Sequence, residues 1–113
     1  MDFWATWCHP CREALPSIEL LHREFKDKGL VVLGVDDEDA PTQSAFLQKF
    51  GYTFGSLTDP AAQVKNAYHV AGFPTTVLID KQGTIQLFEM GDASYASLRK
   101  RFKNSRPFSI WTF

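Results

Sequence analysis

Two cysteines separated by two residues, Cys8 and Cys11, constrain this chain more than any other feature. They follow a short aromatic segment, Asp2 to Trp7, and open an apolar stripe with helical spacing. The sequence therefore predicts a buried strand that leads directly into a helix. A dithiol of this spacing can cycle through a disulfide. Because there is no third cysteine, any redox chemistry must pass through this pair.

The two thiols are predicted to differ in reactivity. Cys8 lies at the expected start of the helix, where unpaired backbone N–H groups and the positive end of the dipole favour the thiolate. His9 adds to this effect when it is protonated. Cys11 falls one turn into the helix, from where it can attack a mixed disulfide formed at Cys8. Cys8 is therefore the expected nucleophile and Cys11 the resolving thiol.

Two other roles for the cysteine pair stay open. A Cys-x-x-Cys pair can bind zinc, but a structural zinc site needs four ligands, and the chain offers only the distant His22 and His69. We interpret these two histidines as a helix-face residue and a helix-end residue. The pair can also form a purely structural disulfide, although a bridge that closes so short a loop contributes little stability. No metal or cofactor is expected.

Length and charge restrict the class of protein. A chain of 113 residues with 44% hydrophobic content can bury one core, which indicates a single domain. The net charge of -1 gives no broad field for nucleic acid or for an anionic membrane. No apolar run approaches the roughly 18 residues that span a bilayer. We therefore expect neither nucleic-acid binding nor a membrane segment in this chain.

Two charged clusters are interpreted as solvated. The acidic run from Asp36 to Asp39 lacks the spacing of a calcium loop and follows a predicted strand, so we expect a solvated loop that ends in a helix cap. Basic residues near the C-terminus complement the dipole at a helix end. They are Arg99, Lys100, Arg101, Lys103 and Arg106.

Predicted strands and helices alternate along the chain. The predicted strands cover residues 2–7, 30–35, 52–57, 75–79 and 84–88, and the predicted helices cover residues 11–26, 40–50, 60–68 and 93–102. Asp39 and Asp59 are the expected caps of the second and third helices. Pro16 predicts a kink in the first helix. This order predicts an α/β fold in three layers, with helices on both faces of a mixed sheet of about five strands.

The pattern of motifs resembles the thioredoxin superfamily, and most closely its TlpA-like (redoxin) branch of thiol-disulfide oxidoreductases. The matching pieces are Phe3 to Cys11, Pro16, Gly72 to Thr76, the hairpin through Gly83, and Gly91. The resemblance implies a thioredoxin-like domain over residues 1–103, followed by a C-terminal tail over residues 104–113. The span from Asp36 to Asn66 looks like the helix-plus-strand insert of this branch.

The resemblance also implies a catalytic group. Its members are Cys8, His9, Pro10, Cys11 and Asp2. Asp2 matches the buried acid beneath the active site of thioredoxins, which accepts or relays the proton of the second thiol. A solvated, merely structural Asp2 is the alternative, because this residue stands beside the terminus.

A substrate-binding rim is implied in the same way. It consists of Trp7, Phe73, Pro74 and Gly91. The resemblance implies a cis peptide bond before Pro74, which would leave the backbone of Phe73 free to pair with an extended substrate segment. An ordinary trans proline that opens an edge strand is the alternative.

The function implied by the resemblance is dithiol-disulfide exchange with protein thiols and disulfides, with an upstream redox partner and no cofactor. A dedicated electron relay for one client, for example in cytochrome c maturation, is the alternative. Peroxidase relatives need a threonine three residues before the reactive cysteine, where this chain has Ala5, so peroxidase activity is not expected. The physiological direction, reductase or oxidase, stays open. An exported or periplasmic location is also implied, although no signal peptide or anchor is visible in the sequence.

The two ends of the chain carry further expectations. The strand from Asp2 to Trp7 should lie in the middle of the sheet, between the strands that begin near Leu30 and Thr75. Because a central strand seldom begins at a native terminus, we expect an excised domain whose natural form has upstream residues. The tail from Phe108 to Phe113 alternates like a strand. It can cover exposed surface, pair with a second chain or stay disordered, and we expect a monomer or weak dimer.

Overall fold

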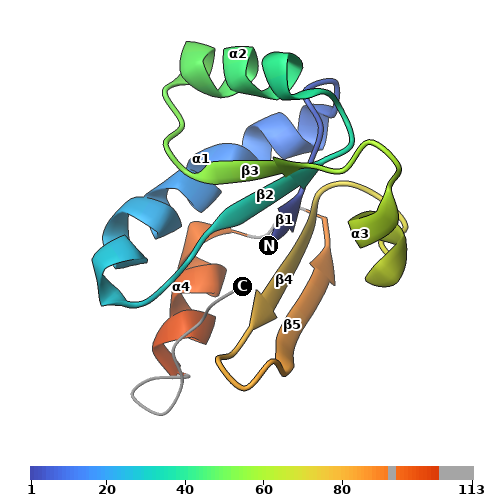
Figure 1. Ribbon diagram of the computed structural model, residues 1–113. Coiled ribbons are helices and arrows are strands. Elements are labelled where there is room, and N and C mark those ends of the chain that lie inside the picture. Colours follow the sequence, from blue (N-terminus) through green and yellow to red (C-terminus); the bar gives the residue numbers. More distant parts are fainter. Residues whose placement is uncertain (92–93, 105–113) are drawn as a thin grey trace.

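The computed structural model describes residues 1–91 and 94–104 (Figure 1). Its strands are β1 (Asp2–Phe3), β2 (Leu33–Asp36), β3 (Gly55–Thr58), β4 (Thr75–Ile79) and β5 (Ile85–Met90). Its α-helices are α1 (His9–Phe25), α2 (Ala40–Phe50), α3 (Gln63–Ala67) and α4 (Tyr95–Asn104). A short 3-10 helix (Lys26–Lys28) extends α1.

The strands form one mixed sheet in the order β3-β2-β1-β4-β5. β1 runs parallel to β2, and β2 runs parallel to β3. β4 is antiparallel to β1 on the other side, and β5 completes a hairpin with β4. β1 therefore lies in the middle of the sheet, between the two strands that the sequence predicts as its neighbours (Figure 1). A short turn joins this central strand to Cys8.

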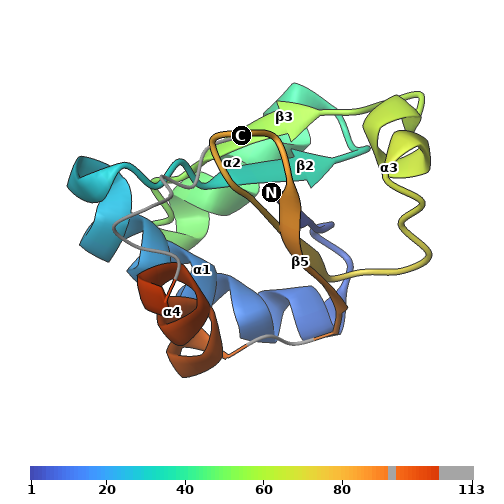
Figure 2. The same cartoon turned by 90° about the horizontal axis from the view of Figure 1, so that it is seen from below.

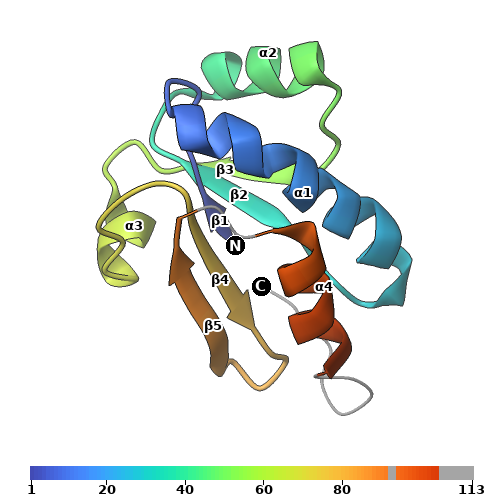
Figure 3. The same ribbon diagram turned by 180° about the vertical axis from the view of Figure 1, so that it is seen from behind.

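Helices cover both faces of the sheet, as predicted. Figures 2 and 3 show α1 and α4 together on one face and α3 on the other. The core on the first face joins α1, α2 and α4 through Leu15, Ile18, Phe46, Leu98 and Phe102. The core on the second face includes Phe3, Val35, Val70 and Val77, with Val64 of α3 packed against it. The architecture is the three-layer α/β sandwich that the sequence predicts.

The predicted strand over residues 2–7 is wrong beyond Phe3. The β1 ladder ends at Phe3, and the N–H of Trp4 then donates to the carbonyl of Val35 at 3.1 Å. Next the chain turns, with the N–H of Cys8 donating to the carbonyl of Ala5 at 3.2 Å. The strand is short because the chain must leave the sheet here to reach the start of α1.

Other element boundaries also differ from prediction. α1 begins at His9 rather than Cys11 and continues through Pro16. The third helix begins at Gln63, and its cap position is Ala62 rather than Asp59. The Asp59 carboxylate nevertheless serves this helix, because it accepts hydrogen bonds from the N–H groups of its first turn. β2, β3 and β5 begin one to three residues later than predicted and end one or two residues later.

The C-terminal boundary shifts slightly. α4 runs from Tyr95 to Asn104, so Asn104 belongs to the last helix and not to the predicted tail. The proposed roles of residues 108–113, and the position of Arg106, lie outside the described residues. His22 lies on α1 and His69 directly follows the α3 region, as interpreted from the sequence. Within the described part of the chain, no helix is long and apolar enough to cross a membrane.

Candidate active site

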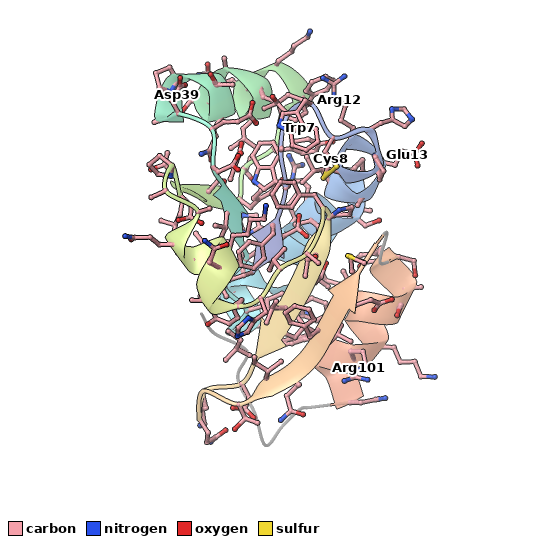
Figure 4. The ribbon with its side chains drawn as sticks, turned by 90° about the vertical axis from the view of Figure 1, so that its right-hand side faces the viewer. Trp7, Cys8, Arg12, Glu13, Asp39 and Arg101 are labelled. Atoms are coloured by element: carbon pink, nitrogen blue, oxygen red, sulfur yellow. A yellow bond between two sulfur atoms is a disulfide. The ribbon has the colours of Figure 1, made fainter. Side chains whose placement is uncertain are left out.

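Cys8 and Cys11 form a disulfide bond at the N-terminus of α1 (Figure 4). Cys8 is the N-cap residue of this helix, with an extended backbone, and its Sγ accepts a hydrogen bond from the N–H of Cys11 at 3.2 Å. Cys8 keeps 4% of its surface exposed, whereas Cys11 is fully buried. Cys8, the less buried of the two cysteines, is thus also the one whose sulfur atom the helix N-terminus stabilises as a thiolate.

This geometry predicts a low pKa for the Cys8 thiol in the reduced protein. The N–H of Cys11 and the helix dipole both stabilise negative charge on Sγ, so the pKa should lie well below the ~8.5 of a free thiol. The measurement is the thiolate absorbance of the Cys11→Ser variant as a function of pH. A Cys8 pKa at or above the free-thiol value would contradict the assignment of Cys8 as nucleophile.

His9 and Pro10 are the first two residues of α1. Pro10 fits this position because its missing N–H is one that the helix would leave unpaired. The His9 side chain is 82% exposed and lies 3.1 Å from the carboxylate of Glu13. Figure 4 shows Glu13 on the solvent side of α1. The structure therefore directs the His9 ring toward Glu13 and solvent, where water screens its charge.

We expect His9 to have a small effect on the redox potential of the pair. Protonated His9 stabilises the Cys8 thiolate, so His9→Gly should lower the potential by about 10–20 mV, the equivalent of a screened charge at a helix terminus. The wild-type potential should still lie above the ~-270 mV of thioredoxin and below the ~-120 mV of DsbA. Equilibration with glutathione buffers measures the redox potentials of the wild type and of His9→Gly. An unchanged or higher potential in His9→Gly would exclude this role.

The four residues predicted for the substrate rim come from three separate segments. Trp7 is 68% exposed, and its ring centroid lies 5.9 Å from that of Phe73. The peptide bond between Phe73 and Pro74 is cis, the isomer that the resemblance implies. The N–H of Gly91 donates to the carbonyl of Pro74 at 2.8 Å. These contacts connect Trp7 to the loop before β4 and to the end of β5.

Two further residues beside this rim were missed by the sequence reasoning. Met90 is 62% exposed at the end of β5, and its Sδ lies close to Gly72, where a Cβ would be only 3.2 Å away. The ammonium of Lys65 in α3 lies 4.9 Å from the centre of the Phe73 ring. No sequence pattern linked Lys65 or Met90 to the cysteines, because this neighbourhood arises only when the sheet assembles.

Asp2 is buried on the face of β1 that meets α1. One carboxylate oxygen accepts from the Thr76 hydroxyl at 3.2 Å, and the other has no partner among the described residues. Burial raises the pKa of Asp2 to about 7, partly offset by the nearby N-terminal ammonium and by Thr76. No hydrogen bond joins this carboxyl to either sulfur atom in the described structure. A small cavity beside it is lined by Ile18 and Leu21 of α1.

The interpretation of the acidic run as a solvated loop is wrong for two of its members. Asp36 is buried, and burial raises its pKa to about 7. Burial also disfavours the charge of Glu38, but hydrogen bonds from Thr6 outweigh it and hold the Glu38 pKa below its usual value. Asp39 is the helix cap that the sequence predicts, accepting from the N–H of Thr42 at 2.8 Å. The run thus packs against the turn that precedes Cys8.

No metal site is evident around the cysteines. Among residues 1–91 and 94–104, no three His, Cys, Asp or Glu side chains are grouped so that they could hold a metal ion. The sulfur atoms bond to each other instead.

Solved structures and sequence relatives that resemble this chain are described as thiol-disulfide exchange proteins or as thioredoxin-like. A crystal structure described as a putative thiol:disulfide interchange protein DsbE from Chlorobium tepidum superposes with a TM-score of 0.84 at 31% identity, covering 92% of this chain and 76% of that one. Thiol-disulfide oxidoreductase ResA of Geobacillus kaustophilus is 33% identical over 95% of this chain and 62% of its own length. Thioredoxin-like protein YneN of Bacillus subtilis is 33% identical over 89% of this chain and 61% of its own length.

This chain therefore spans less than two thirds of the length of those two relatives. The thioredoxin-like fold and the resemblance to thiol-disulfide oxidoreductases are confirmed by these matches. The model of the AhpC/TSA family matches residues 1–88, which include both cysteines, the acidic run and the cis-proline loop. The chain belongs to the AhpC/TSA family.

Proposed function

We propose that this protein is a thiol-disulfide oxidoreductase that exchanges its Cys8–Cys11 couple with protein substrates. The observation that carries the proposal is the position of Cys8, which caps α1, accepts the N–H of Cys11 and lies beside the exposed Trp7. Relatives named thiol-disulfide oxidoreductase support the same activity. A purely structural disulfide would need neither an exposed aromatic rim nor a cap position.

The exchange proceeds in two steps. The Cys8 thiolate attacks one sulfur of a substrate disulfide, a Cys8–substrate disulfide forms, and the other substrate sulfur leaves as a thiolate. The Cys11 thiol then loses its proton and attacks Sγ of Cys8, which forms the Cys8–Cys11 disulfide and releases the second substrate thiolate. The substrate is reduced by two electrons, and an upstream dithiol protein restores the reduced pair. The same steps in reverse oxidise a substrate dithiol.

Asp2 is the proposed acceptor for the Cys11 proton. Its pKa of about 7 suits a group that takes up and releases protons near neutral pH. No hydrogen bond joins Asp2 to Cys11 in the described structure, so the transfer requires a bridging water between the two buried groups. This role would explain why a carboxyl with one unpartnered oxygen is buried here.

The proposed substrate surface is the apolar rim beside Cys8, formed by Trp7, Phe73 and Gly91, with Met90 at its edge. Pro74, predicted as part of this rim, is fully buried and supports it from beneath. No hydrogen bond from another described residue occupies the N–H or the carbonyl of Phe73. These groups can pair with an extended substrate segment, as a strand pairs with a sheet edge. Large exposed aromatic and sulfur-containing side chains also suit a surface that binds several sequences.

Reduction of insulin disulfides is the direct test of the activity. The reduced protein should reduce insulin repeatedly when dithiothreitol is supplied. Activity confined to one client protein, with none toward insulin, would favour a dedicated electron relay instead. Consumption of hydroperoxide by the reduced protein would favour a peroxidase.

Trp7→Ala should slow exchange with proteins while the fold stays stable. The ring is mostly exposed, so its loss removes substrate contact and little core packing. We expect the rate with insulin to fall about tenfold and the free energy of unfolding to change by less than about 1 kcal/mol. Insulin reduction and denaturant unfolding measure the two quantities. Equal rates in the variant and the wild type would remove Trp7 from the substrate surface.

A further inference from the structure

All three polar backbone and side-chain groups of Thr6 are held by two charged side chains. The N–H and the hydroxyl of Thr6 each donate to a different oxygen of the Glu38 carboxylate, both at 2.7 Å. The Thr6 carbonyl accepts from Nε of Arg12 at 2.9 Å. Thr6 lies two residues before Cys8 in the turn that joins β1 to α1. Glu38 belongs to the loop after β2, more than thirty residues away in sequence.

We propose that Glu38 is a positioning residue of the active site. Together with Arg12 it clamps Thr6 and thereby fixes the turn that presents Trp7 and Cys8 to a protein substrate. The inference deepens the exchange activity proposed above and rests on it. No hydrogen bond joins the side chain of Glu38 or Arg12 to a sulfur atom in the described structure, so both side chains act through Thr6.

Glu38 can serve as a fixed point because its own backbone is held. The N–H of Glu38 donates to the carboxylate of Asp36 at 2.9 Å. The buried amide of Gln43, in α2, donates to the carbonyls of Asp36 and Glu38 at 3.2 and 3.0 Å. Gln43 in turn accepts from the hydroxyl of Ser56 in β3 at 2.7 Å. These hydrogen bonds tie the loop to α2 and β3 and so restrain it.

The other half of the clamp is anchored to helices. Arg12 is in the first turn of α1, and its guanidinium carbon lies 5.5 Å from the centre of the Phe46 ring of α2. Figure 4 shows Arg12, Trp7 and Cys8 at the same end of the molecule. Thr6 is thus bridged to α1 on one side and, through Glu38, to β2 and α2 on the other.

The clamp matters most for Trp7. This ring is 68% exposed, and its one ring contact among the described residues is with Phe73. Because the ring has so few contacts, its position depends on the backbone of the turn, and Thr6, the preceding residue, anchors that backbone. A small disulfide needs only Sγ of Cys8, whereas a protein disulfide also touches the rim. Loosening the turn should therefore slow protein substrates more than small ones.

The experiment compares Glu38→Gln with Asp37→Asn. Both variants lose one carboxylate from the same loop, but no hydrogen bond joins Asp37 to Thr6 in the described structure. Glutamine offers one carbonyl oxygen where glutamate offers two, so one Thr6 donor loses its acceptor. We expect Glu38→Gln to reduce insulin about tenfold more slowly than wild type, and to react with oxidised glutathione within about twofold of the wild-type rate. Asp37→Asn should match wild type in both reactions.

Thr6→Val gives a second variant that tests the same contact from the other side. With valine at position 6 only the backbone donor remains, and the single carbonyl of glutamine can accept it. The effect of Glu38→Gln on the insulin rate should therefore be smaller in the Thr6→Val background than in wild type. If the two substitutions lower the rate of insulin reduction by independent, multiplicative factors, the proposed clamp is wrong.

Hydrogen exchange at the Thr6 amide provides a readout that needs no substrate. It should quicken in Glu38→Gln and stay unchanged in Asp37→Asn. If this exchange is the same in all variants, or if Glu38→Gln slows insulin and glutathione reactions equally, the proposal is wrong. A wild-type protein that cannot reduce insulin would instead defeat the proposed function, and the Thr6 exchange would still decide whether the clamp exists.

Discussion

Replacing Cys8 with serine will reduce insulin turnover to the rate observed without protein. Among the residues of the chain there is no other thiol apart from Cys11, which is fully buried and is bonded to Cys8. A serine hydroxyl at the same cap position stays protonated near neutral pH and cannot attack a disulfide at a comparable rate. Fold and stability should change little, since serine is itself a good N-cap residue.

Cys11→Ser is the matched variant, and it should lose the second step of the exchange rather than the first. The Cys8 thiolate still attacks a substrate disulfide, but no second thiol resolves the product. We therefore expect a stable mixed disulfide between Cys8 and the substrate, which mass spectrometry identifies after digestion. A mixed disulfide through Cys11 in the Cys8→Ser variant, with none in Cys11→Ser, would reverse the roles assigned to the two cysteines.

The chemistry of the site was accessible from the sequence because its main residues are neighbours in the chain. Cys8, His9, Pro10 and Cys11 occupy one helical turn, so helix-terminus arguments apply to them without any tertiary information. The hairpin strand Thr75–Ile79 was also predicted with its observed bounds, because a β-branched run before a glycine turn is a strong local signal.

The supports of the site were not accessible in this way. A run of four acidic residues is usually solvated, and no local pattern distinguishes Glu38 from its neighbours. Its partner Thr6 is distant in sequence, and the two meet only because β1 and β2 are parallel neighbours whose carboxyl ends lie together. Asp59 illustrates the same limit on a smaller scale. Its capping chemistry was recognised, but the left-handed conformation of Ala62 moves the helix start.

Asp2→Asn will stabilise the protein at alkaline pH and leave it nearly unchanged in acid. Burial raises the pKa of Asp2 from 3.8 to about 7 in the folded protein. Below pH 4 the carboxyl is mostly neutral in both folded and unfolded chains, so its burial then carries little electrostatic penalty. Between about pH 4 and 7 the unfolded chain ionises Asp2 while the folded protein keeps it protonated, so stability falls over this range and the loss is complete above about pH 7. The full difference is about 4 kcal/mol, at about 1.4 kcal/mol per pKa unit.

Denaturant unfolding at pH 4 and pH 8 measures this difference, and the exposed Asp27 provides the control. Asp27→Asn should shift the free energy of unfolding by less than about 0.5 kcal/mol at either pH. In Asp2→Asn the asparagine carbonyl can still accept the Thr76 hydroxyl, so the comparison isolates the charge. Equal stability of Asp2→Asn and wild type at pH 8 would show that the Asp2 carboxyl is not desolvated in the folded protein.

The same variant decides whether Asp2 also handles protons during exchange. Asparagine cannot accept the Cys11 proton, so resolution of the mixed disulfide should slow even though the protein is more stable. Attack by Cys8 on the substrate should keep its rate, because that step does not require Cys11 to lose its proton. Stopped-flow measurement of both steps at pH 7 separates them. If the variant is more stable but resolves the mixed disulfide at the wild-type rate, Asp2 has no role in the exchange reaction and only lowers the stability of the fold.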